Sequence, residues 1–451
     1  MNADHRPSSD RRIQFGVFFQ GVNFHTIWSS PDSGSQHDFA SFRQVAQTAE
    51  RGLFSAFFLG EGLRLREHFG RIHDLDVAGR PDAQTQLAAL AAVTERIGLV
   101  ATQNTTYNEP YDLARRLASL DLLSDGRAGW NVVTTDNAWT GENFRRGGWL
   151  DHADRYRRAE QFVRAAEQLW AGRATGAGSP AGDVTIDESL VRLSAPAPLP
   201  ASRQGRPVIF QAGDSDAGRE FAASSADVIF SAHGGLDDAI AFAADVRRRL
   251  PAYGRSRDEL AFFPGQHFVL ADTADEARDK AEWVGTAQVS PQTAIRFLEP
   301  VWGTDLSGYD PDGPLPDIDP VIDEADGQRG AAFQGRRAFE TARAWREAAA
   351  AEGLSIRRFV IRQSARRAIV GSYADVADLL VRYVDSGAVD GFNVSPYLVP
   401  GGLDDIVDGL IPLLQERGIY PTEYPGTTLR ENLGLPPLSA AGDAAADDAA
   451  A

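Results

Sequence analysis

The sequence predicts an α/β fold, a (β/α)8 barrel of the TIM type with insertions. Short apolar runs alternate with longer stretches of helical periodicity, as expected for successive strand–helix units around a parallel sheet. There are eight such runs, and eight units fit a closed barrel better than an open sheet. A chain of 451 residues is also long enough for one large barrel whose core needs no disulfides.

The predicted strands can be placed in chain order. They cover residues 13–19, 56–59, 98–102, 128–133, 207–211, 228–231, 262–270 and 391–394. A helical pattern follows each of the first seven strands, and the clearest of these patterns cover residues 39–51, 84–96, 111–123, 154–170 and 237–250.

Two regions interrupt this alternation. Residues 172–205, rich in Gly, Pro, Ala and Ser, predict a long excursion between the fourth helix and the fifth strand. Residues from about 280 to 357 contain WGTDLSGYDPDGPLPDIDP, whose prolines and aspartates are incompatible with regular structure. Because that stretch keeps large apolar side chains such as Trp302 and Leu315, we expect an ordered insertion near the barrel mouth.

The domain organisation expected from these patterns is simple. Residues 1–12 are predicted to be a disordered N-terminus, and residues 13–436 a single barrel carrying the insertion at about 280–357. Residues 437–451 form an acidic tail that is too poor in large apolar residues to fold, so we expect it to be disordered.

Charge and hydropathy exclude several classes of partner. The chain has 45 basic and 63 acidic side chains, a formal net charge of −18, which disfavours contact with phosphate backbones. No apolar run approaches the roughly 20 residues of a membrane span, and the N-terminus lacks the apolar segment of a secretory signal. We therefore expect a cytoplasmic protein that binds neither nucleic acid nor membranes.

The chain contains no cysteine, and its one methionine is Met1. Disulfides, thiolate catalysis, iron–sulfur clusters and zinc sites built from cysteine are thus excluded. Lys280 is the only lysine, so Schiff-base chemistry is confined to that position. Redox chemistry, if present, must use a bound organic cofactor or a metal held by histidines and carboxylates.

The segment after the fifth predicted strand has features of a phosphate site. Gly213 and Gly218 permit close backbone approach, Ser215 offers a hydroxyl, and the helix that follows presents free N–H groups. A glycine-bearing turn without a ligand is the alternative. A Walker-type nucleotide site is disfavoured, because Arg219 and Glu220 stand where Lys and Ser or Thr would be required.

The same segment has some resemblance to a nucleophile elbow, with Ser215 between a strand and a helix. A serine hydrolase would then need a later acid and histidine. Only His233 and His267 follow in the chain, and Ala217 occupies the second glycine position of the elbow. These departures argue against a hydrolase.

Dinucleotide and metal signals are weak. No G-x-G-x-x-G motif follows any predicted strand, so no nicotinamide fingerprint is present. His68, His73, Asp74 and Asp76 gather in one loop but lack the helical His-x-x-x-His spacing. We therefore predict no metal site, and interpret this arginine-containing loop as solvated or facing an anionic or polar substrate.

Polar residues gather where the second, third and fourth predicted strands end, which is where barrel enzymes build their sites. His152 and Tyr156 lie four apart at the start of the next helix and share one face. A capping or packing role is the alternative for His152. The full set suits a planar heteroaromatic ligand and consists of Glu61, Thr102, Asn104, Asn131, Thr134, Thr135, His152 and Tyr156.

The run NEPYDLARRLASLDLLSDGRAGWNVVTT at residues 108–135 closely resembles the luciferase-like, flavin-dependent monooxygenases of the nitrilotriacetate monooxygenase component A group. This group includes the pristinamycin synthase component A and dibenzothiophene sulfone monooxygenases. Further resemblance runs through residues 46–59, 150–169, 207–221 and 424–435, and so nearly from end to end.

The resemblance implies a barrel that binds reduced FMN (FMNH2), delivered by a separate NAD(P)H:flavin reductase in a two-component system. Reaction with O2 would give a C4a-peroxyflavin that hydroxylates, desaturates, or cleaves a C–N or C–S bond in a small organic substrate. A flavin-binding luciferase-like barrel without monooxygenase turnover is the alternative. A homodimer or homotetramer is expected from the resemblance alone, which fixes neither the substrate nor the reductase.

The family's FMN contacts can be carried over residue by residue. They fall on Glu61, Thr102, His152, Tyr156 and Ser215, and Asn131 is added because it lies in the matched Trp-Asn-Val-Val-Thr motif. Relatives usually have aspartate where this chain has Glu61. His152 is our candidate catalytic residue.

Overall fold

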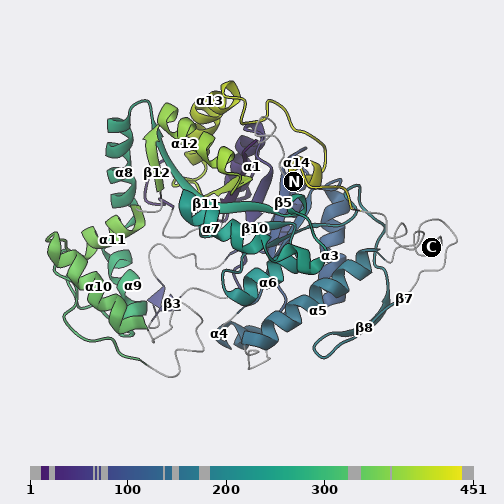
Figure 1. Cartoon of the computed structure of the whole chain (residues 1–451). Coiled ribbons are helices and arrows are strands. Elements are labelled where there is room, and N and C mark those ends of the chain that lie inside the picture. Colours follow the sequence, from purple (N-terminus) through teal and green to yellow (C-terminus); the bar gives the residue numbers. More distant parts are fainter. Residues whose placement is uncertain are drawn as a thin grey trace.

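Eight parallel strands close into a barrel (Figure 1). The computed structural model describes residues 12–19, 26–63, 67–68, 71–72, 80–135, 138–144, 152–171, 183–322, 337–365 and 368–438. The barrel strands, in order around the barrel, are β1 (Gln14–Phe19), β2 (Ala56–Leu59), β5 (Gly98–Asn104), β6 (Ala128–Val133), β9 (Val208–Gln211), β10 (Val228–Ser231), β11 (Ala261–Ala271) and β13 (Gly391–Val394). The parallel pairings of β10 with β11, of β11 with β13 and of β13 with β1 close the barrel.

The predicted fold class is confirmed, and each predicted strand corresponds to a strand of the barrel. β11 differs most, because it continues beyond the barrel as an 11-residue strand. Its second half pairs in parallel with β12 (Ala368–Ser372), which lies outside the closed barrel and was not predicted.

Helices surround the barrel in the usual alternation. The helices of the strand–helix units are α1 (Phe39–Arg51), α2 (Ala83–Ala91), α3 (Pro110–Leu123), α5 (His152–Ala171), α6 (Asp216–Ser225), α7 (Leu236–Arg247), α8 (Ala274–Gln288) and α12 (Tyr373–Ser386). The shorter α-helices include α4 (Ala138–Gly141), α13 (Ile411–Glu416), which follows β13, and α14 (Leu429–Asn432). Within the described ranges, no helix combines the length and the apolar character needed to cross a membrane.

The second helix is shorter than the prediction of residues 84–96. It ends at Ala91, and the chain then turns toward β5. The Glu50 carboxylate accepts hydrogen bonds from the backbone N–H groups of Glu95, Arg96 and Ile97, at 2.6–2.9 Å. These bonds take the place of the backbone bonds that a longer helix would make. The helix therefore ends before the helical periodicity of the sequence does.

The excursion at residues 172–205 contains regular structure that was not predicted. Strands β7 (Asp183–Asp187) and β8 (Arg192–Pro196) form an antiparallel hairpin. Another short antiparallel pair, β3 (Glu67–His68) and β4 (Arg71–Ile72), follows β2. Both pairs lie outside the barrel sheet.

The region after β11 holds α8 and three further helices, α9 (Pro291–Trp302), α10 (Ala338–Ala351) and α11 (Ile356–Ala365). Residues 303–322 are irregular, in the stretch whose prolines and aspartates predicted this. Trp302, Trp345 and Phe359 pack together in a separate small core, with neighbouring ring centroids 5.5–6.3 Å apart. In Figure 1, α9, α10 and α11 lie on the same side of the barrel as β3 and α4, the elements that follow the carboxyl ends of β2 and β6.

Candidate flavin site at the carboxyl end of the barrel

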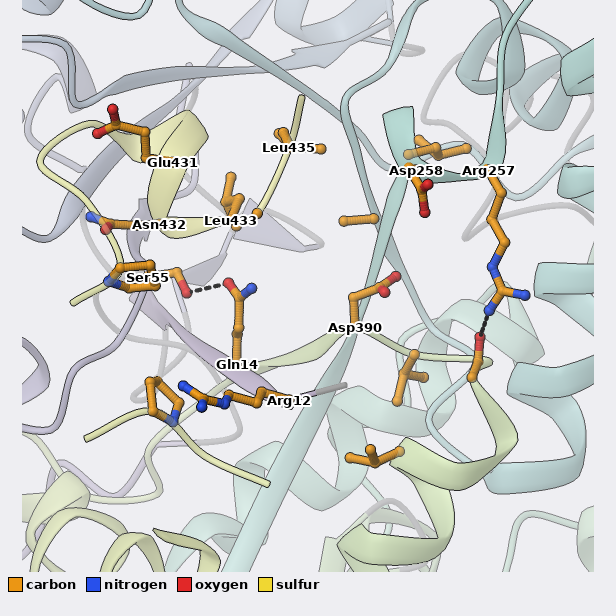
Figure 2. A pocket seen from close by; sticks show the side chains of 18 of the residues that line it. Arg12, Gln14, Ser55, Arg257, Asp258, Asp390, Glu431, Asn432, Leu433 and Leu435 are labelled. Atoms are coloured by element: carbon orange, nitrogen blue, oxygen red, sulfur yellow. Dashed lines mark hydrogen bonds between the residues drawn. The ribbon is translucent and has the colours of Figure 1, made fainter. Parts of the chain in front are cut away.

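The two ends of the barrel differ. A cavity of about 500 Å³ lies at the amino end, where Figure 2 shows Arg12, Gln14 and Asp390 beside Leu433 and Leu435 near α14. Gln14 begins β1, and Asp390 immediately precedes β13. Because barrel enzymes place their chemistry at the carboxyl ends of the strands, this cavity is not the candidate site.

Four aromatic rings fill the barrel interior below its carboxyl end. Phe18 contacts Phe58 and Phe230 with ring centroids 5.2 and 5.4 Å apart, and Phe58 also contacts Phe210 at 5.9 Å. Phe58 and Phe210 are buried, whereas Phe18 and Phe230 are partly exposed. Phe18 and Phe230 are thus the rings of this set that a ligand could reach, and we call these two rings the apolar floor.

A polar pair from β5 and β6 points into the barrel. A Cβ at Gly129 would lie 3.0 Å from the side chains of Val100 and Phe210, so this face of β6 is the inner one. Asn131, two residues further on, shares that face, and its Nδ2 donates to the Thr102 hydroxyl at 3.1 Å. The Asn131 Oδ1 is buried and has no partner among the described residues. An unpaired buried acceptor suits a ligand N–H.

Glu61 and Asn104 meet where β2 and β5 end. Asn104 Nδ2 lies 3.1 Å from each carboxylate oxygen of Glu61, and Arg80 donates to the Glu61 backbone carbonyl at 3.3 Å. Burial raises the pKa of Glu61 to about 7, although the Asn104 hydrogen bond opposes this rise. Glu61 can therefore gain or lose a proton near neutral pH.

The loop from β9 to α6 is built around two close glycines. A Cβ on Gly213 would lie 2.7 Å from the Gly218 Cα, so neither position tolerates a side chain without a shift of the backbone. Gln211 Oε1 accepts from the Gly213 N–H at 2.8 Å. Ser215 caps α6, with its Oγ accepting from the Gly218 N–H at 3.1 Å. The Gly213 and Gly218 N–H groups are thus occupied, but residues 214–217 are exposed, so an incoming anion can reach the backbone at the start of α6.

Tyr156 brings α5 to this loop. Its hydroxyl lies 3.3 Å from the Ser215 hydroxyl, and its ring packs against Phe221 with centroids 6.3 Å apart. A Cβ at Gly218 would also come within 3.0 Å of the Tyr156 hydroxyl. Two hydroxyls and the first turn of a helix therefore converge at one point.

Two aspartates flank Ser215, and cations neutralise both. Asp214 contacts Arg219 at 3.0 Å and His233 at 2.7 Å. Asp216 contacts Arg249 at 2.6 Å. The His233 hydrogen bond, aided by Arg219, holds the pKa of Asp214 below its usual range. These pairs reduce the repulsion that the carboxylates would exert on an anion near the helix.

The structure brings together some of the predicted residues. Thr102 with Asn131, and Tyr156 with Ser215, form two contacting pairs, and Glu61 joins Asn104 instead of either pair. His152 is the first residue of α5, but its side chain lies outside the described part of the structure. The roles assigned to all these residues remain predictions.

The hydrolase interpretation finds no support in the described contacts. Ser215 contacts Tyr156 and the Gly218 N–H, and both ring nitrogens of His233 contact carboxylates. His267 directs its Nδ1 to the Ser395 carbonyl at 3.2 Å. The described residues also contain no group of three metal-binding side chains, while the loop side chains from His68 to Asp76 lie outside them.

Sequence reasoning missed two features of this rim. Gln211 supports the glycine loop, although it was treated only as the end of a strand. His233 enters the sequence argument only as a hydrolase partner, yet its imidazole joins the loop before α6 to the start of α7 through Asp214 and Asp238. Its position two residues after a predicted strand and just before Gly234 and Gly235 was the available signal.

Several known proteins are similar to this chain over most of its length. The sequence model of luciferase-like monooxygenases matches residues 13–390. The chain is 38% identical to nitrilotriacetate monooxygenase component A of Aminobacter aminovorans, covering 95% of this chain and 97% of that protein. It is 37% identical to N-acetyl-S-(2-succino)cysteine monooxygenase of Bacillus subtilis, covering 95% and 98%. A solved riboflavin lyase, RcaE, with modified FMN and riboflavin superposes with a TM-score of 0.75 at 29% identity, covering 94% of this chain and 96% of that one.

Proposed function

The chain belongs to the luciferase-like monooxygenase family and is a flavin-dependent monooxygenase, and on that premise we propose that its flavin is reduced FMN. A separate NAD(P)H:flavin reductase would supply the FMNH2, in keeping with one relative named as component A and another named as FMNH2-dependent. The substrates would be O2 and a small organic molecule. The arrangement of Ser215, Tyr156 and the glycine pair at the start of α6 is the single observation that carries this proposal.

The described residues suit each part of FMN. The helix start and the hydroxyls of Ser215 and Tyr156 would hold the phosphate, since N–H groups and hydroxyls donate to anionic oxygens. The unpaired Asn131 Oδ1 would accept from a ring N–H of the isoalloxazine, beside Thr102. The apolar floor of Phe18 and Phe230 would support the ring face.

When bound, reduced FMN supplies the two electrons that cleave O2, so that one oxygen atom enters the substrate and the other leaves as water. The protein's part is to orient the ring and keep water away from it. Glu61 lies at the same rim with its pKa raised to about 7 by burial, so it can hold or release a proton there.

We assign His152 as the catalytic candidate on the family resemblance and on its place at the start of α5. It lies one helical turn before Tyr156, on the same face of the helix. In this assignment the imidazole contacts the flavin ring or ribityl chain and exchanges a proton near it. Glu61, with one methylene more than the usual aspartate, would contact the flavin near Asn104.

The experiment combines flavin binding with turnover. His152→Ala should lower coupling, measured as product formed per reduced FMN consumed with a flavin reductase and O2. Tyr156→Phe should weaken FMN binding, and Tyr111→Phe, a partly buried tyrosine on α3, is the matched control. Unchanged FMN affinity in Tyr156→Phe together with unchanged coupling in His152→Ala would contradict the site assignment.

A further inference from the structure

His233 bridges two aspartates, one in the loop before α6 and one in the first turn of α7. It lies between β10 and α7, and its Nε2 is 2.7 Å from Asp214 Oδ1 while its Nδ1 is 2.7 Å from Asp238 Oδ2. Asp214 immediately precedes Ser215, the residue that caps α6, and Asp238 lies in the first turn of α7. The imidazole therefore links the loop before α6 to the start of α7.

The two contacts favour the protonated form of the His233 ring. A neutral imidazole has one N–H, so only one of its nitrogens can donate to a carboxylate. Two contacts at 2.7 Å to two carboxylates are satisfied together only by the imidazolium. Burial lowers the pKa of His233, but the hydrogen bonds and charges of Asp214 and Asp238 outweigh it and raise the pKa above its ordinary value.

The surroundings hold the ring in place. Its face stacks on Phe242 with centroids 4.4 Å apart, and the side chain is 17% exposed. Arg219 of α6 donates to Asp214 and to Asp245 of α7, each at 3.0 Å, and its guanidinium lies over the same Phe242 ring at 4.8 Å. Asp214 is thus neutralised by one cation of fixed charge and one that titrates.

We propose that His233 is a positioning residue for the FMN phosphate: as an imidazolium it fixes the Asp214–Ser215 loop and cancels the charge of Asp214 beside the phosphate. This inference rests on the proposed placement of the phosphate at Ser215. The consequence is that FMN binds most tightly when His233 is protonated, and that binding takes up a proton.

The direction of the pH effect follows from the contacts. Loss of the His233 proton turns one of the two bonds into a contact between two acceptors and leaves Asp214 with Arg219 alone. The Asp214 carboxylate then repels the phosphate, and the Asp214–Ser215 loop loses one of the contacts that hold it in place. By linkage, FMN affinity falls as the pH rises through the pKa of His233.

The test measures FMN and riboflavin affinities by flavin fluorescence from about pH 6.5 to about pH 9, a range above the second phosphate pKa of about 6. Wild-type affinity for FMN should fall about tenfold across this range, and riboflavin affinity should stay nearly constant, because riboflavin has no phosphate. His233→Gln should bind FMN about tenfold more weakly at the low end and show a flat profile. Asp238→Asn should shift the fall to lower pH, because it removes one of the carboxylates that raise the pKa of His233.

Arg248→Gln is the charge-matched control. It removes a cation at the end of α7 whose partner is Asp245, away from the imidazole. Its FMN profile should match the wild type. A pH dependence that is the same in His233→Gln and the wild type would overturn the inference, as would equal weakening of FMN and riboflavin in that variant. A wild-type protein that binds FMN no better than riboflavin would instead overturn the phosphate placement itself, and with it this inference.

Discussion

Asn104 donates its Nδ2 to both carboxylate oxygens of Glu61, at 3.1 Å each, at the carboxyl ends of two neighbouring strands. A single amide hydrogen-bonding group is a modest compensation for the burial of a carboxylate. Burial therefore dominates and raises the pKa of Glu61 to about 7. Ionisation of Glu61 in this pair therefore lowers the stability of the folded protein.

Glu61→Gln is expected to stabilise the protein at high pH. In the folded state the pKa is raised, so the unfolded chain ionises first, and the wild type loses stability as the pH rises from about 4.5 to about 7. The variant should gain up to about 3 kcal/mol in free energy of unfolding at pH 8 and little near pH 5. Urea unfolding at both values measures this, with the exposed Glu95→Gln as control. A gain that is equal at both pH values would contradict the raised pKa.

Ser215→Ala should weaken FMN binding more than riboflavin binding, because it removes a hydroxyl and the cap of α6. Loss of such a cap costs about 1 kcal/mol of protein stability, whereas loss of a hydrogen bond to the charged phosphate, worth about 1.5–3 kcal/mol, should lower FMN affinity about tenfold or more. Ser372→Ala is the matched control, since Ser372 caps α12 through the Asp375 N–H in the same way. Equal effects of the two variants on FMN affinity would show that Ser215 acts only as a cap.

The substitution Asn131→Leu separates the contribution of Asn131 to protein stability from its contribution to flavin binding. The Asn131 Oδ1 is buried without a partner in the described structure, whereas its Nδ2 donates to Thr102, so the relief of one unpaired acceptor and the loss of one buried hydrogen bond oppose each other, and the free energy of unfolding should change by no more than about 1 kcal/mol. Affinity for both FMN and riboflavin should fall, because the ring of each would lose the same acceptor. Thermal unfolding and fluorescence titration together measure the two effects. Undiminished binding of both flavins would place the ring elsewhere in the barrel mouth.

Lys280→Met is expected to lower the free energy of unfolding by about 1–2 kcal/mol. The ammonium donates to Asp405 at 2.6 Å and to the Leu270 carbonyl at 3.0 Å, which fastens α8 to β11 and to the segment after β13. Adding Asp405→Asn should recover part of the loss, because the carboxylate would no longer lack its cation. If the changes in free energy of unfolding of the two single variants simply added in the double variant, the two side chains would not stabilise each other.

The sequence predicts the barrel well because each strand is a short apolar run bounded by helical periodicity. β12 was missed because it pairs only with the part of β11 that extends beyond the barrel, and nothing local marks such an extension. The early end of α2 depends on the Glu50 carboxylate, whose contact with residues 95–97 spans two structural units. Long-range contacts of this kind are not visible as periodicity.

The contacts of the candidate site are likewise of two kinds, those that the sequence pattern predicts and those that depend on the packing of distant segments. The Thr102–Asn131 contact follows from two neighbouring parallel strands whose inward positions coincide, which the pattern of the sequence already contains. The approach of Tyr156 to Ser215 depends on how α5 packs beside α6, and the two partners of His233 depend on how adjacent loops fold toward each other. Side-chain contacts of this kind can be identified only from the structure.

Flavin-dependent oxygenation by this barrel is tested by mixing the complex of the protein and reduced FMN with O2. Stopped-flow absorbance should show a species distinct from both reduced and oxidised flavin, which decays more slowly than free reduced FMN is reoxidised. The Ser215→Ala variant should require more protein to show the same phase. Reoxidation in one step, at the rate of free reduced FMN and at protein concentrations that bind all the flavin, would contradict the assignment of this barrel as a flavin-dependent monooxygenase.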